Sequence, residues 1–207
     1  MQKTPFHFYY TARLLENLPK ADKLIPVFAS SDIQIYPFQV AAASFAMRSP
    51  YQKGVILCDE AGIGKTHEAM LVVVQRWLEG MSNILISVPN ADLLMQWIDT
   101  LDRYYTIPYV VLASREDWEQ NSSGENTNAF EQNAVILTTY DFLTDQQEAA
   151  KQIKWSFTVF EEANILSSVS TEDSKQAKIL KEIAEDSFKI LLTGTPIEKN
   201  IMDLYGL

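Results

Sequence analysis

Residues 59–66, DEAGIGKT, combine the groups that a protein needs to hold a nucleoside triphosphate. Gly62 and Gly64 allow the backbone to curl around phosphate oxygens, and the following helix would present its first N–H groups and the positive end of its dipole. The ammonium group of Lys65 can reach the β- and γ-phosphates, and the hydroxyl group of Thr66 can bind Mg²⁺. We therefore predict a phosphate-binding loop with ATP and Mg²⁺ as cofactors.

The setting of this loop supports the prediction, although its first position is unusual. It follows the apolar run GVILC, Gly54–Cys58, as a phosphate loop follows a strand. The common pattern G-x-x-x-x-G-K-[ST] begins with glycine, where this chain has Asp59. On these residues alone, a chance turn is the alternative. His67 is expected to be a helix residue without a catalytic task. The predicted nucleotide-contacting residues around the loop are Gly62, Ile63, Gly64, Lys65, Thr66 and His67.

A pair of acidic residues follows another apolar run later in the chain. Phe157–Phe160 is followed directly by Glu161 and Glu162. Glu161 would hold Mg²⁺, usually through water, and Glu162 would orient and deprotonate the water that attacks the γ-phosphate. Glu162 and Lys65 are thus the predicted catalytic residues, and Thr66 and Glu161 the predicted metal ligands. The alternative is that both acids are the solvated end of a strand.

Short apolar runs alternate along the chain with longer segments of helical periodicity. The runs are continuous and rich in β-branched residues, as strands buried on both faces of a parallel sheet are. They are Gly54–Cys58, Asn83–Val88, Tyr109–Leu112, Ala134–Leu137, Phe157–Phe160 and Lys189–Leu192. Apolar residues recur at helical spacing within segments 66–79, 93–105 and 180–184. This alternation predicts an α/β fold of three layers, with a mainly parallel central sheet and helices on both faces.

The loop DEAGIGKT resembles the first motif of superfamily-two helicases, in the DE-x-G-x-GKT form of the Swi/Snf family of DNA translocases. Members of that family also lack the first glycine, so the resemblance accounts for Asp59. It implies a RecA-like P-loop NTPase lobe that binds ATP and Mg²⁺ as part of a motor on double-stranded DNA. Residues 48–69, RSPYQKGVILCDEAGIGKTHEA, look closer to bacterial members, including those acting around RNA polymerase or in phage defence, than to chromatin remodellers.

The acidic pair departs from the pattern that this resemblance implies. Relatives read D-E-A-H where this chain has Glu161, Glu162, Ala163 and Asn164. The extra methylene of Glu161 shifts its carboxylate by roughly 1.5 Å, which could slow the chemistry. Asn164 replaces a histidine that in relatives helps to link the hydrolysis site to a DNA-contacting motif. Asparagine keeps hydrogen-bonding groups and loses the ring, so the coupling of hydrolysis to movement is in question.

Further elements match the family in its order. Gln39, in IYPFQ, stands where relatives have a glutamine that contacts the adenine edge, and an amide can both donate and accept as adenine requires. Its alternative is a surface helix residue after a proline at the helix start. Asn90, in SVPN, stands at a strand end that touches the DNA backbone in relatives, and equally it could be a helix N-cap. Trp97, in the QW that follows, is expected to belong to the core.

Two more elements supply candidates for nucleic-acid contact. Thr139 lies in a TTY element, which in relatives is a phosphate-contacting strand end. Thr193 and Gly194 lie in LTGTPI, and the chain continues through Asn200 to DLY, as in the relatives' LTGTP-x-x-N-x-x-x-DLY. Thr193 and Thr195 could relay the state of the γ-phosphate toward the nucleic acid.

The resemblance covers residues 35–207, which we predict to form one helicase-like ATP-binding lobe. Residues 1–34 are expected to form an accessory helix and an extended segment. A second RecA-like lobe, absent from this chain, would complete the active site with arginines. Duplex DNA would bind through both lobes, and other proteins on DNA are further candidate partners. The chain alone should bind nucleotide weakly and turn it over negligibly.

Composition fits an ordinary globular protein. Hydrophobic residues make up 47% of the chain and charged residues 21%. No apolar run approaches the roughly 18 residues of a membrane span, and the N-terminus MQKTPFHFYY lacks the layout of a secretory signal. A single cysteine, Cys58, excludes an internal disulfide framework and fits a reducing compartment, so we expect a cytoplasmic protein without membrane contact.

The net charge of −10 is unfavourable for binding DNA phosphates. The acidity is concentrated in residues 113–187, which carry fifteen acidic and six basic side chains, whereas residues 1–112 carry ten and nine. Because the acidic residues are distributed so unevenly, their negative electrostatic potential need not extend over a DNA-binding groove. DNA binding by the lobe alone should nevertheless be weak. Within the acidic part, the polar stretch Gln120–Asn128 is expected to be a mobile surface loop.

Two classes of function stay open on the sequence. The leading hypothesis is the ATPase lobe of a double-stranded-DNA translocase, which hydrolyses ATP to ADP and phosphate. The alternative is a degenerate nucleotide- or partner-binding module, in which the EEAN departure impairs hydrolysis. A small-molecule kinase built on the same loop would need the missing first glycine and leaves the TGTP element unexplained.

Overall fold

The computed structural model describes residues 35–48, 53–60, 62–122, 127–170 and 175–197. The accessory segment predicted for residues 1–34 lies outside this range, as does the end of the TGTP element from residue 198. None of the helices in the described part is long and apolar enough to cross a bilayer. In chain order the elements are α3 (Pro37–Arg48), β1 (Gly54–Leu57), α4 (Lys65–Leu78), β2 (Ile84–Val88), α5 (Ala91–Tyr104), β3 (Tyr109–Val111), α6 (Arg115–Asn121), β4 (Val135–Thr139), α7 (Tyr140–Asp145), α8 (Gln147–Lys151), β5 (Phe157–Phe160), the 3₁₀ helix η1 (Ala163–Ser170), α9 (Lys175–Ile183) and β6 (Phe188–Leu192).

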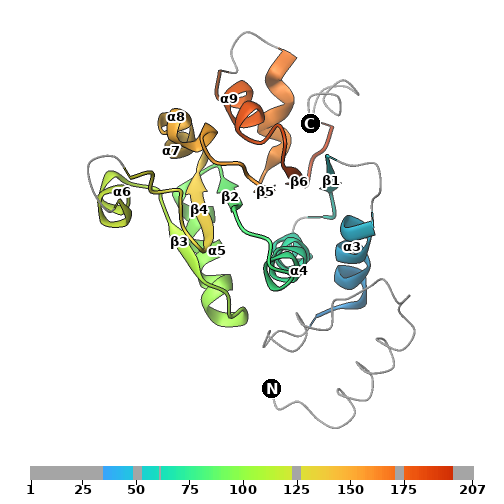
Figure 1. Ribbon diagram of the computed structural model, residues 1–207. Coiled ribbons are helices and arrows are strands. Elements are labelled where there is room, and N and C mark those ends of the chain that lie inside the picture. Colours follow the sequence, from blue (N-terminus) through green and yellow to red (C-terminus); the bar gives the residue numbers. More distant parts are fainter. Residues whose placement is uncertain (1–34, 49–52, 61, 123–126, 171–174, 198–207) are drawn as a thin grey trace.

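Six strands form one sheet in which every pair of neighbours is parallel. Their order across the sheet is β1-β6-β5-β2-β4-β3. Parallel neighbours require crossover connections, which place the helices on the two faces of the sheet (Figure 1). The predicted three-layer α/β fold with a parallel central sheet is confirmed.

Each face of the sheet has its own hydrophobic core. Helices α3, α4 and α5 pack on one face, over a cluster that includes Ile84 and Ile86 of β2. Helices α7, α8 and α9 pack with η1 on the other face, over a cluster that includes Leu85 and Ile136. Because side chains alternate between faces along a strand, all five residues of β2 are buried. This burial on both faces explains why the strands are continuous apolar runs in the sequence.

All six predicted strands are present. Phe157–Phe160 matches β5 residue for residue, and the other five differ by one or two residues at their ends. At the start of β1, a Cβ atom on Gly54 would lie 2.4 Å from the carbonyl oxygen of Lys189, so β1 and β6 approach at a distance that only glycine permits. The edge strand β1 is thereby held close to its neighbour β6.

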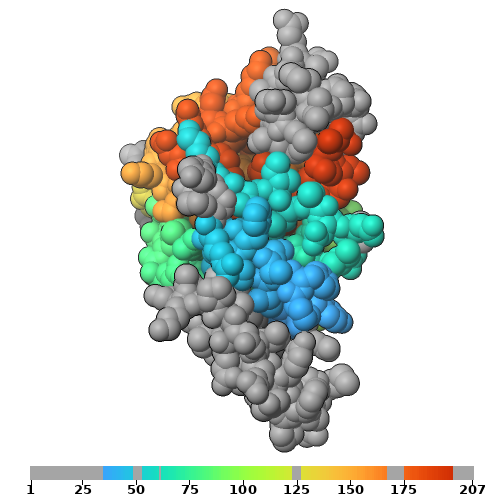
Figure 2. Space-filling model, turned by 90° about the vertical axis from the view of Figure 1, so that its right-hand side faces the viewer, coloured from blue at the N-terminus to red at the C-terminus, as the bar shows by residue number. Residues whose placement is uncertain are grey.

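The helices of the first layer show two kinds of burial. Every residue of α4 from Glu68 to Gln75 is buried, because α4 lies between the sheet and α3. The sequence analysis predicted one apolar face for residues 66–79, whereas the middle of this helix is buried on all sides. Helix α5 does have one buried face, formed by Leu94, Trp97 and Leu101. Figure 2 shows α3, in blue, on the molecular surface directly beside the cyan residues that follow it in the chain.

The predicted surface loop at 120–128 is partly wrong. Residues 120 and 121 belong to α6, whose start at Arg115 is capped by Ser114, the hydroxyl group of which accepts from the N–H of Asp117. The cap favours helix in a polar segment that has no apolar periodicity. Residues 123–126 lie outside the described part.

Candidate functional site

The predicted site residues converge on one edge of the sheet. All six strands are parallel, so their carboxyl ends share one edge, where ligands of open α/β sheets bind. The register pairs Leu57 of β1 with Leu192 of β6, and Leu191 of β6 with Phe160 of β5. The loop after β1 and the acids after β5 therefore lie on the two sides of the end of β6.

The glycine-rich loop leads into α4 through left-handed backbone. Gly62 has a φ of 85° and Gly64 a φ of 101°, a region that glycine adopts without strain. Gly64 is the N-cap residue of α4, and no side chain caps this helix start. Within the first turn, the N–H of His67 donates to the carbonyl of Gly64 at 2.9 Å. An uncapped helix start with a positive dipole end is suited to an anion such as a phosphate.

Lys65 is folded back under the loop. Its side chain is only 8% exposed, and Nζ donates to the carbonyl oxygens of Asp59 at 2.9 Å and Glu60 at 3.3 Å. A Cβ atom on Gly194, at the end of β6, would lie 3.8 Å from Nζ. Burial and the Glu162 charge raise the pKa of Glu161, and the Lys65 charge opposes this rise. The ammonium group thus lies within electrostatic reach of the acids beyond β6.

Gln39 holds the same loop from α3. Its Nε2 donates to the carbonyl of Ile63 at 3.2 Å, and its Oε1 accepts from the N–H of Tyr36 at 3.0 Å. A Cβ atom on Gly64 would lie 2.6 Å from Nε2, so the amide packs directly against the loop. Gln39 is only 2% exposed. The alternative of a surface helix residue is therefore wrong, because the loop at Ile63 and Gly64 covers the Gln39 side chain. Contact with adenine stays a prediction.

The next two predicted contacts, Thr66 and His67, differ in their surroundings. Thr66 is half-buried in the first turn of α4. The ring of His67 lies edge-on to Tyr104, and its Nδ1 is 3.2 Å from the hydroxyl group of Tyr105. Burial lowers the pKa of His67. The His67 side chain thus packs against the end of α5, which agrees with the prediction of a helix residue that has no catalytic task.

Glu161 is a buried carboxylate, so the solvated strand end is wrong for this residue. It is 6% exposed, and its Oε2 accepts the indole N–H of Trp97 at 3.2 Å. Burial and the neighbouring charge of Glu162 raise the pKa of Glu161 to about 7, while Trp97 and Lys65 act in the opposite direction. Its backbone is also fixed, since its N–H donates to the Ser87 carbonyl and its carbonyl accepts from the Tyr140 hydroxyl.

Glu162 turns the chain away from β5. Its φ of 50° lies in the left-handed region, which is uncommon for residues other than glycine and asparagine and is concentrated at functional sites. The turn leads into η1, and it leaves the Glu162 side chain only half-buried. The acidic pair therefore consists of one enclosed carboxylate and one that water can reach.

The segment after the acids reaches the end of β6. Asn164 Oδ1 lies 3.5 Å from the hydroxyl oxygen of Thr193, a long hydrogen bond, and that oxygen accepts from the N–H of Thr195 at 3.1 Å. Asparagine thus keeps a connection where relatives are expected to have histidine. Thr193 is fully buried, which suits the predicted relay better than a direct contact with nucleic acid. Gly194, the next residue, is exposed.

The two remaining candidates for nucleic-acid contact are helix N-caps. Asn90 Oδ1 accepts from the N–H of Leu93 at 2.9 Å, and Thr139 Oγ1 accepts from the N–H of Phe142 at 3.3 Å. The N-cap alternative for Asn90 is confirmed. The hydroxyl group of Thr139 starts α7, a helix that the sequence analysis missed. Contact of either residue with DNA stays a prediction.

Sequence reasoning missed one buried charge beside the loop. Glu68, in the first turn of α4, is 0% exposed, and the Asp59 side chain lies close enough to interact with its carboxyl group. Burial, followed by the nearby Asp59 carboxylate, raises the pKa of Glu68 to about 7, and Lys65 opposes the shift. The only available signal was its place in a helix that follows a buried strand. Trp97 was correctly assigned to the core, and its need for a partner for the buried N–H could have pointed to Glu161.

The residues present fit the Mg²⁺ ion of a bound nucleotide. Across the described ranges, no group of three or more His, Cys, Asp or Glu could hold a metal ion alone. Mg²⁺ usually keeps several waters and binds through one or two carboxylates together with substrate phosphates. One buried carboxylate after β5, Glu161, and one hydroxyl group in the first turn of α4, Thr66, match that requirement.

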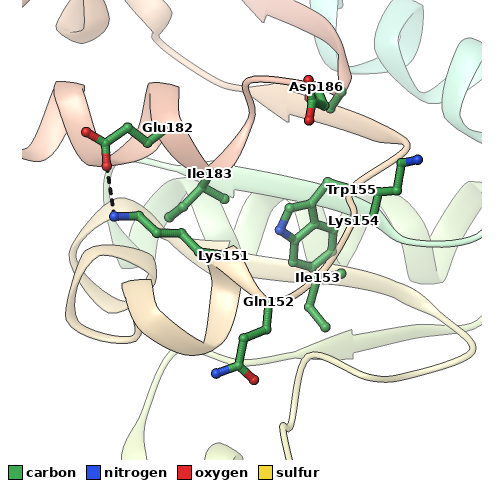
Figure 3. A pocket seen from close by; sticks show the side chains of 9 residues that line it. Lys151, Gln152, Ile153, Lys154, Trp155, Glu182, Ile183 and Asp186 are labelled. Atoms are coloured by element: carbon green, nitrogen blue, oxygen red, sulfur yellow. Dashed lines mark ion pairs between the residues drawn. The ribbon is translucent and has the colours of Figure 1, made fainter.

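A separate hollow of about 220 Å³ lies at the opposite edge of the sheet. Trp155 lines it just before β5, and Ser187 just before β6, so it lies at the amino ends of these strands. Figure 3 shows the ion pair between Lys151 and Glu182, two of the residues that line the hollow, with N···O at 2.8 Å. The hollow is therefore distinct from the edge where the predicted site residues meet.

Comparison with known protein families identifies the family of this chain. A model of the SNF2-related domain matches residues 38–207. The chain belongs to the SNF2-related family. It is similar to the chromodomain-helicase-DNA-binding protein 1-like of Danio rerio, with 28% identity over 203 residues, which is 93% of this chain and 19% of that protein. It is also similar to the RNA polymerase-associated protein RapA of Photobacterium profundum, with 32% identity over 150 residues, 70% of this chain and 15% of that protein.

Solved structures agree with this assignment. The Sulfolobus solfataricus SWI2/SNF2 ATPase core in complex with dsDNA matches 86% of this SNF2-related chain and 35% of its own length, with a TM-score of 0.68 and 25% identity. A second structure, of the Sulfolobus solfataricus SWI2/SNF2 ATPase core domain, matches this chain with a TM-score of 0.65 and 23% identity. The RecA-like, helicase-like N-terminal lobe is thus confirmed. The SNF2-related chain spans less than a fifth of the curated relatives that it matches.

Proposed function

We propose that this SNF2-related chain is the ATP-binding lobe of a motor that hydrolyses ATP and moves on double-stranded DNA. One observation carries the proposal: the phosphate loop and the acids flank the end of β6, where a Cβ atom on Gly194 would lie 3.8 Å from Nζ of Lys65. Relatives support the DNA substrate, because the structure from Sulfolobus solfataricus is described as a complex with dsDNA.

Each side chain at this edge has a part in the proposed reaction. Lys65 leaves the carbonyl groups of Asp59 and Glu60 and donates to the β- and γ-phosphates instead. Thr66 and Glu161 would hold Mg²⁺, which would neutralise charge that develops on the phosphates. Glu162, which water can reach, accepts a proton from the attacking water. The water oxygen bonds to the γ-phosphorus as the bond to the bridging oxygen breaks, and ADP and phosphate leave.

Movement on DNA requires that hydrolysis of the nucleotide change the structure of the protein at its DNA contacts. The contact between Asn164 and Thr193 joins the segment after the acids to the end of β6. Asn90, Thr139 and Gly194 lie at the same edge and are the proposed contacts with the DNA backbone. A second RecA-like lobe, expected in the complete protein, would close over the nucleotide and supply arginines. Residues 1–207 alone would then bind nucleotide weakly and hydrolyse it negligibly.

A degenerate binding module is the second candidate, and one observation favours it. Burial raises the pKa of Glu161 to about 7, so near neutral pH this carboxyl group is not fully ionised. A carboxyl group that keeps its proton is a poor Mg²⁺ ligand. Nucleotide binding would then persist with little hydrolysis.

The test is nucleotide affinity measured with a fluorescent ADP analogue in the presence of Mg²⁺. Lys65→Ala should weaken binding by roughly ten- to a hundredfold, because hydrogen bonds to charged groups are worth about 1.5–3 kcal/mol. Lys154→Ala, which changes an exposed lysine at the opposite edge, is the control and should bind as the unaltered chain does. Equal affinity of all three chains would exclude a nucleotide site at the loop.

Hydrolysis by the complete protein separates the two candidates. A translocase lobe predicts ATP turnover that duplex DNA stimulates and that Glu162→Gln abolishes. Nucleotide binding without turnover, with or without DNA, would establish the degenerate module instead.

A further inference from the structure

Trp97 forms a specific polar contact in addition to its place in the core. The side chain is 1% exposed, and the indole N–H donates to Oε2 of Glu161 at 3.2 Å. A buried indole N–H needs an acceptor, and here the acceptor is a carboxylate 64 positions away in sequence. The contact joins α5, on one face of the sheet, to the end of β5.

The surroundings of Glu161 make this contact decisive for the orientation of its carboxylate. The backbone of Glu161 is fixed on both sides, by the carbonyl of Ser87 and the hydroxyl group of Tyr140. Beyond the backbone, the Glu162 charge repels the carboxylate, and the Lys65 charge attracts it. A hydrogen bond has a preferred direction, which these longer-range charges lack. Trp97 therefore supplies the directional constraint.

Side-chain length explains why such a constraint matters in this chain. Glutamate has one more rotatable bond than the aspartate that relatives are expected to carry at this position. An additional free rotor lets the carboxylate occupy several places, and fixing it costs conformational entropy when a metal ion binds. Partners that orient a metal-binding carboxylate typically change metal affinity by ten- to a hundredfold.

We infer that Trp97 is a positioning residue, whose indole N–H holds the Glu161 carboxylate in the orientation that Mg²⁺ of a bound nucleotide requires. The inference rests on the proposed function, because it concerns the metal ion at that same site. It assigns Trp97 a role that its place in the core does not require, since phenylalanine could fill most of the same volume.

The first test compares Trp97→Phe with Trp155→Phe. Trp155 is also buried, at 3% exposed, and its indole N–H donates to the carbonyl of Ala150 at 3.0 Å, near the opposite edge of the sheet. Both variants remove one buried indole hydrogen bond. The measurement is the affinity for the fluorescent ADP analogue with Mg²⁺ divided by the affinity with EDTA. Trp97→Phe should lower this ratio roughly tenfold, with the affinity in EDTA unchanged, whereas Trp155→Phe should leave the ratio unchanged.

A second test does not depend on nucleotide or on the fold of Trp97→Phe. The four tryptophans each give an indole N–H signal in a ¹H–¹⁵N spectrum. Glu161→Gln should shift the Trp97 indole signal, because an amide group replaces the carboxyl group that accepts the hydrogen bond, and should leave the Trp155 signal in place. A third test returns to nucleotide affinity: Glu161→Asp, whose shorter side chain does not reach the Trp97 indole, should lower the Mg²⁺ ratio by itself, and adding Trp97→Phe to it should cause no further loss.

The outcomes separate the inference from the function on which it rests. If the unaltered chain shows no difference between Mg²⁺ and EDTA, the proposed metal site is wrong, and the role of Trp97 is wrong with it. If the unaltered chain shows the difference and Trp97→Phe keeps it, only the inference is overturned. The inference alone is also overturned if Glu161→Gln does not shift the Trp97 indole signal. The same holds if Trp97→Phe lowers the Mg²⁺ ratio further in the Glu161→Asp background.

Discussion

Glu68 is a fully buried carboxyl group beside the phosphate loop. Burial and the neighbouring Asp59 side chain raise its pKa from 4.5 to about 7. Between these two pH values, the unfolded chain releases this proton and the folded chain retains it. The free energy of unfolding contributed by Glu68 therefore falls as pH rises through this window and levels off above about pH 7.

Replacing Glu68 with glutamine should stabilise the protein at alkaline pH. At pH 8 we expect Glu68→Gln to raise the free energy of unfolding by about 1–3 kcal/mol, since one unit of pKa corresponds to about 1.4 kcal/mol. At pH 5 the effect should be small, because a protonated glutamate and a glutamine have similar shape and no charge. Denaturant unfolding followed by circular dichroism at both pH values measures it. Glu131→Gln, at an exposed position, is the control, and an equal effect of Glu68→Gln at both pH values would contradict the argument.

At the scale of the elements, the strands were predictable and several helices were not. Strands such as Val135–Thr139 are buried on both faces, so they appear in the sequence as apolar runs. Helices α6, α7 and α8 have five to seven residues, too few for a periodic pattern to emerge. Side-chain hydrogen bonds cap the starts of α6 and α7, such as the one that Thr139 makes at α7, whereas no side chain caps α8. A threonine in a TTY element is equally consistent with a strand end, and tertiary structure decides between them.

The loop before α4 gives a prediction that distinguishes backbone strain from a steric collision. Gly62→Ala introduces a Cβ with no neighbour within 4 Å at a φ of 85°, so only strain of about 1–2 kcal/mol is expected. Gly64→Ala adds to this strain a Cβ at 2.6 Å from Nε2 of Gln39. Gly64→Ala should therefore lose more stability and more nucleotide affinity than Gly62→Ala. Thermal unfolding and ADP titration measure both.

A double variant isolates the collision in this pair. Gln39→Ala in the Gly64→Ala background removes the side chain that the new Cβ meets, so the remaining loss of stability should approach that of Gly62→Ala plus Gln39→Ala. If Gly64→Ala is no worse than Gly62→Ala, the packing of Gln39 on the loop does not constrain this position.

The start of α5 gives a prediction that separates capping from DNA contact. Asn90→Ala should lower the free energy of unfolding by about 1 kcal/mol, because the side chain that accepts from the N–H of Leu93 is lost. Asn90→Ser keeps a capping oxygen and should restore most of the stability. Denaturant unfolding measures this difference. Loss of DNA binding by the complete protein in Asn90→Ala, but not in Asn90→Ser, would mean that the cap itself matters for DNA. Equal stability of the two variants would contradict the capping role.

For the molecule as a whole, the order of the strands determines the site, and the sequence alone does not give that order. The motifs predicted which residues matter, and their order along the chain is that of the family. The strand order places the loop after β1 and the acids after β5 on the two sides of the end of β6, although the two segments are far apart in the sequence. The partners of Glu161 and Gln39 depend on packing across layers, which no local pattern specifies. The sequence therefore predicts candidate residues, while burial and pairing require the fold.

The last prediction concerns what residues 1–207 can do when expressed alone. The net charge is −10, and phosphate contacts dominate the affinity of proteins for DNA. We therefore expect duplex DNA to bind at physiological salt no more tightly than roughly 10⁻⁴ M, the weak end of nonspecific binding. We also expect ATP turnover to stay at the level of Lys65→Ala, with or without DNA. Fluorescence anisotropy of a labelled duplex and a phosphate-release assay measure the two quantities.

The control is the complete protein under the same conditions, in which DNA should stimulate turnover in proportion to its binding. The acidic residues of segment 113–187 oppose DNA, and the second lobe expected in the complete protein would supply basic surface and arginines. Turnover by residues 1–207 that duplex DNA stimulates above the level of Lys65→Ala would show that one lobe suffices. In that case, Asn90, Thr139 and Gly194, at the edge where the nucleotide site lies, would be the first residues to substitute in search of the DNA contact.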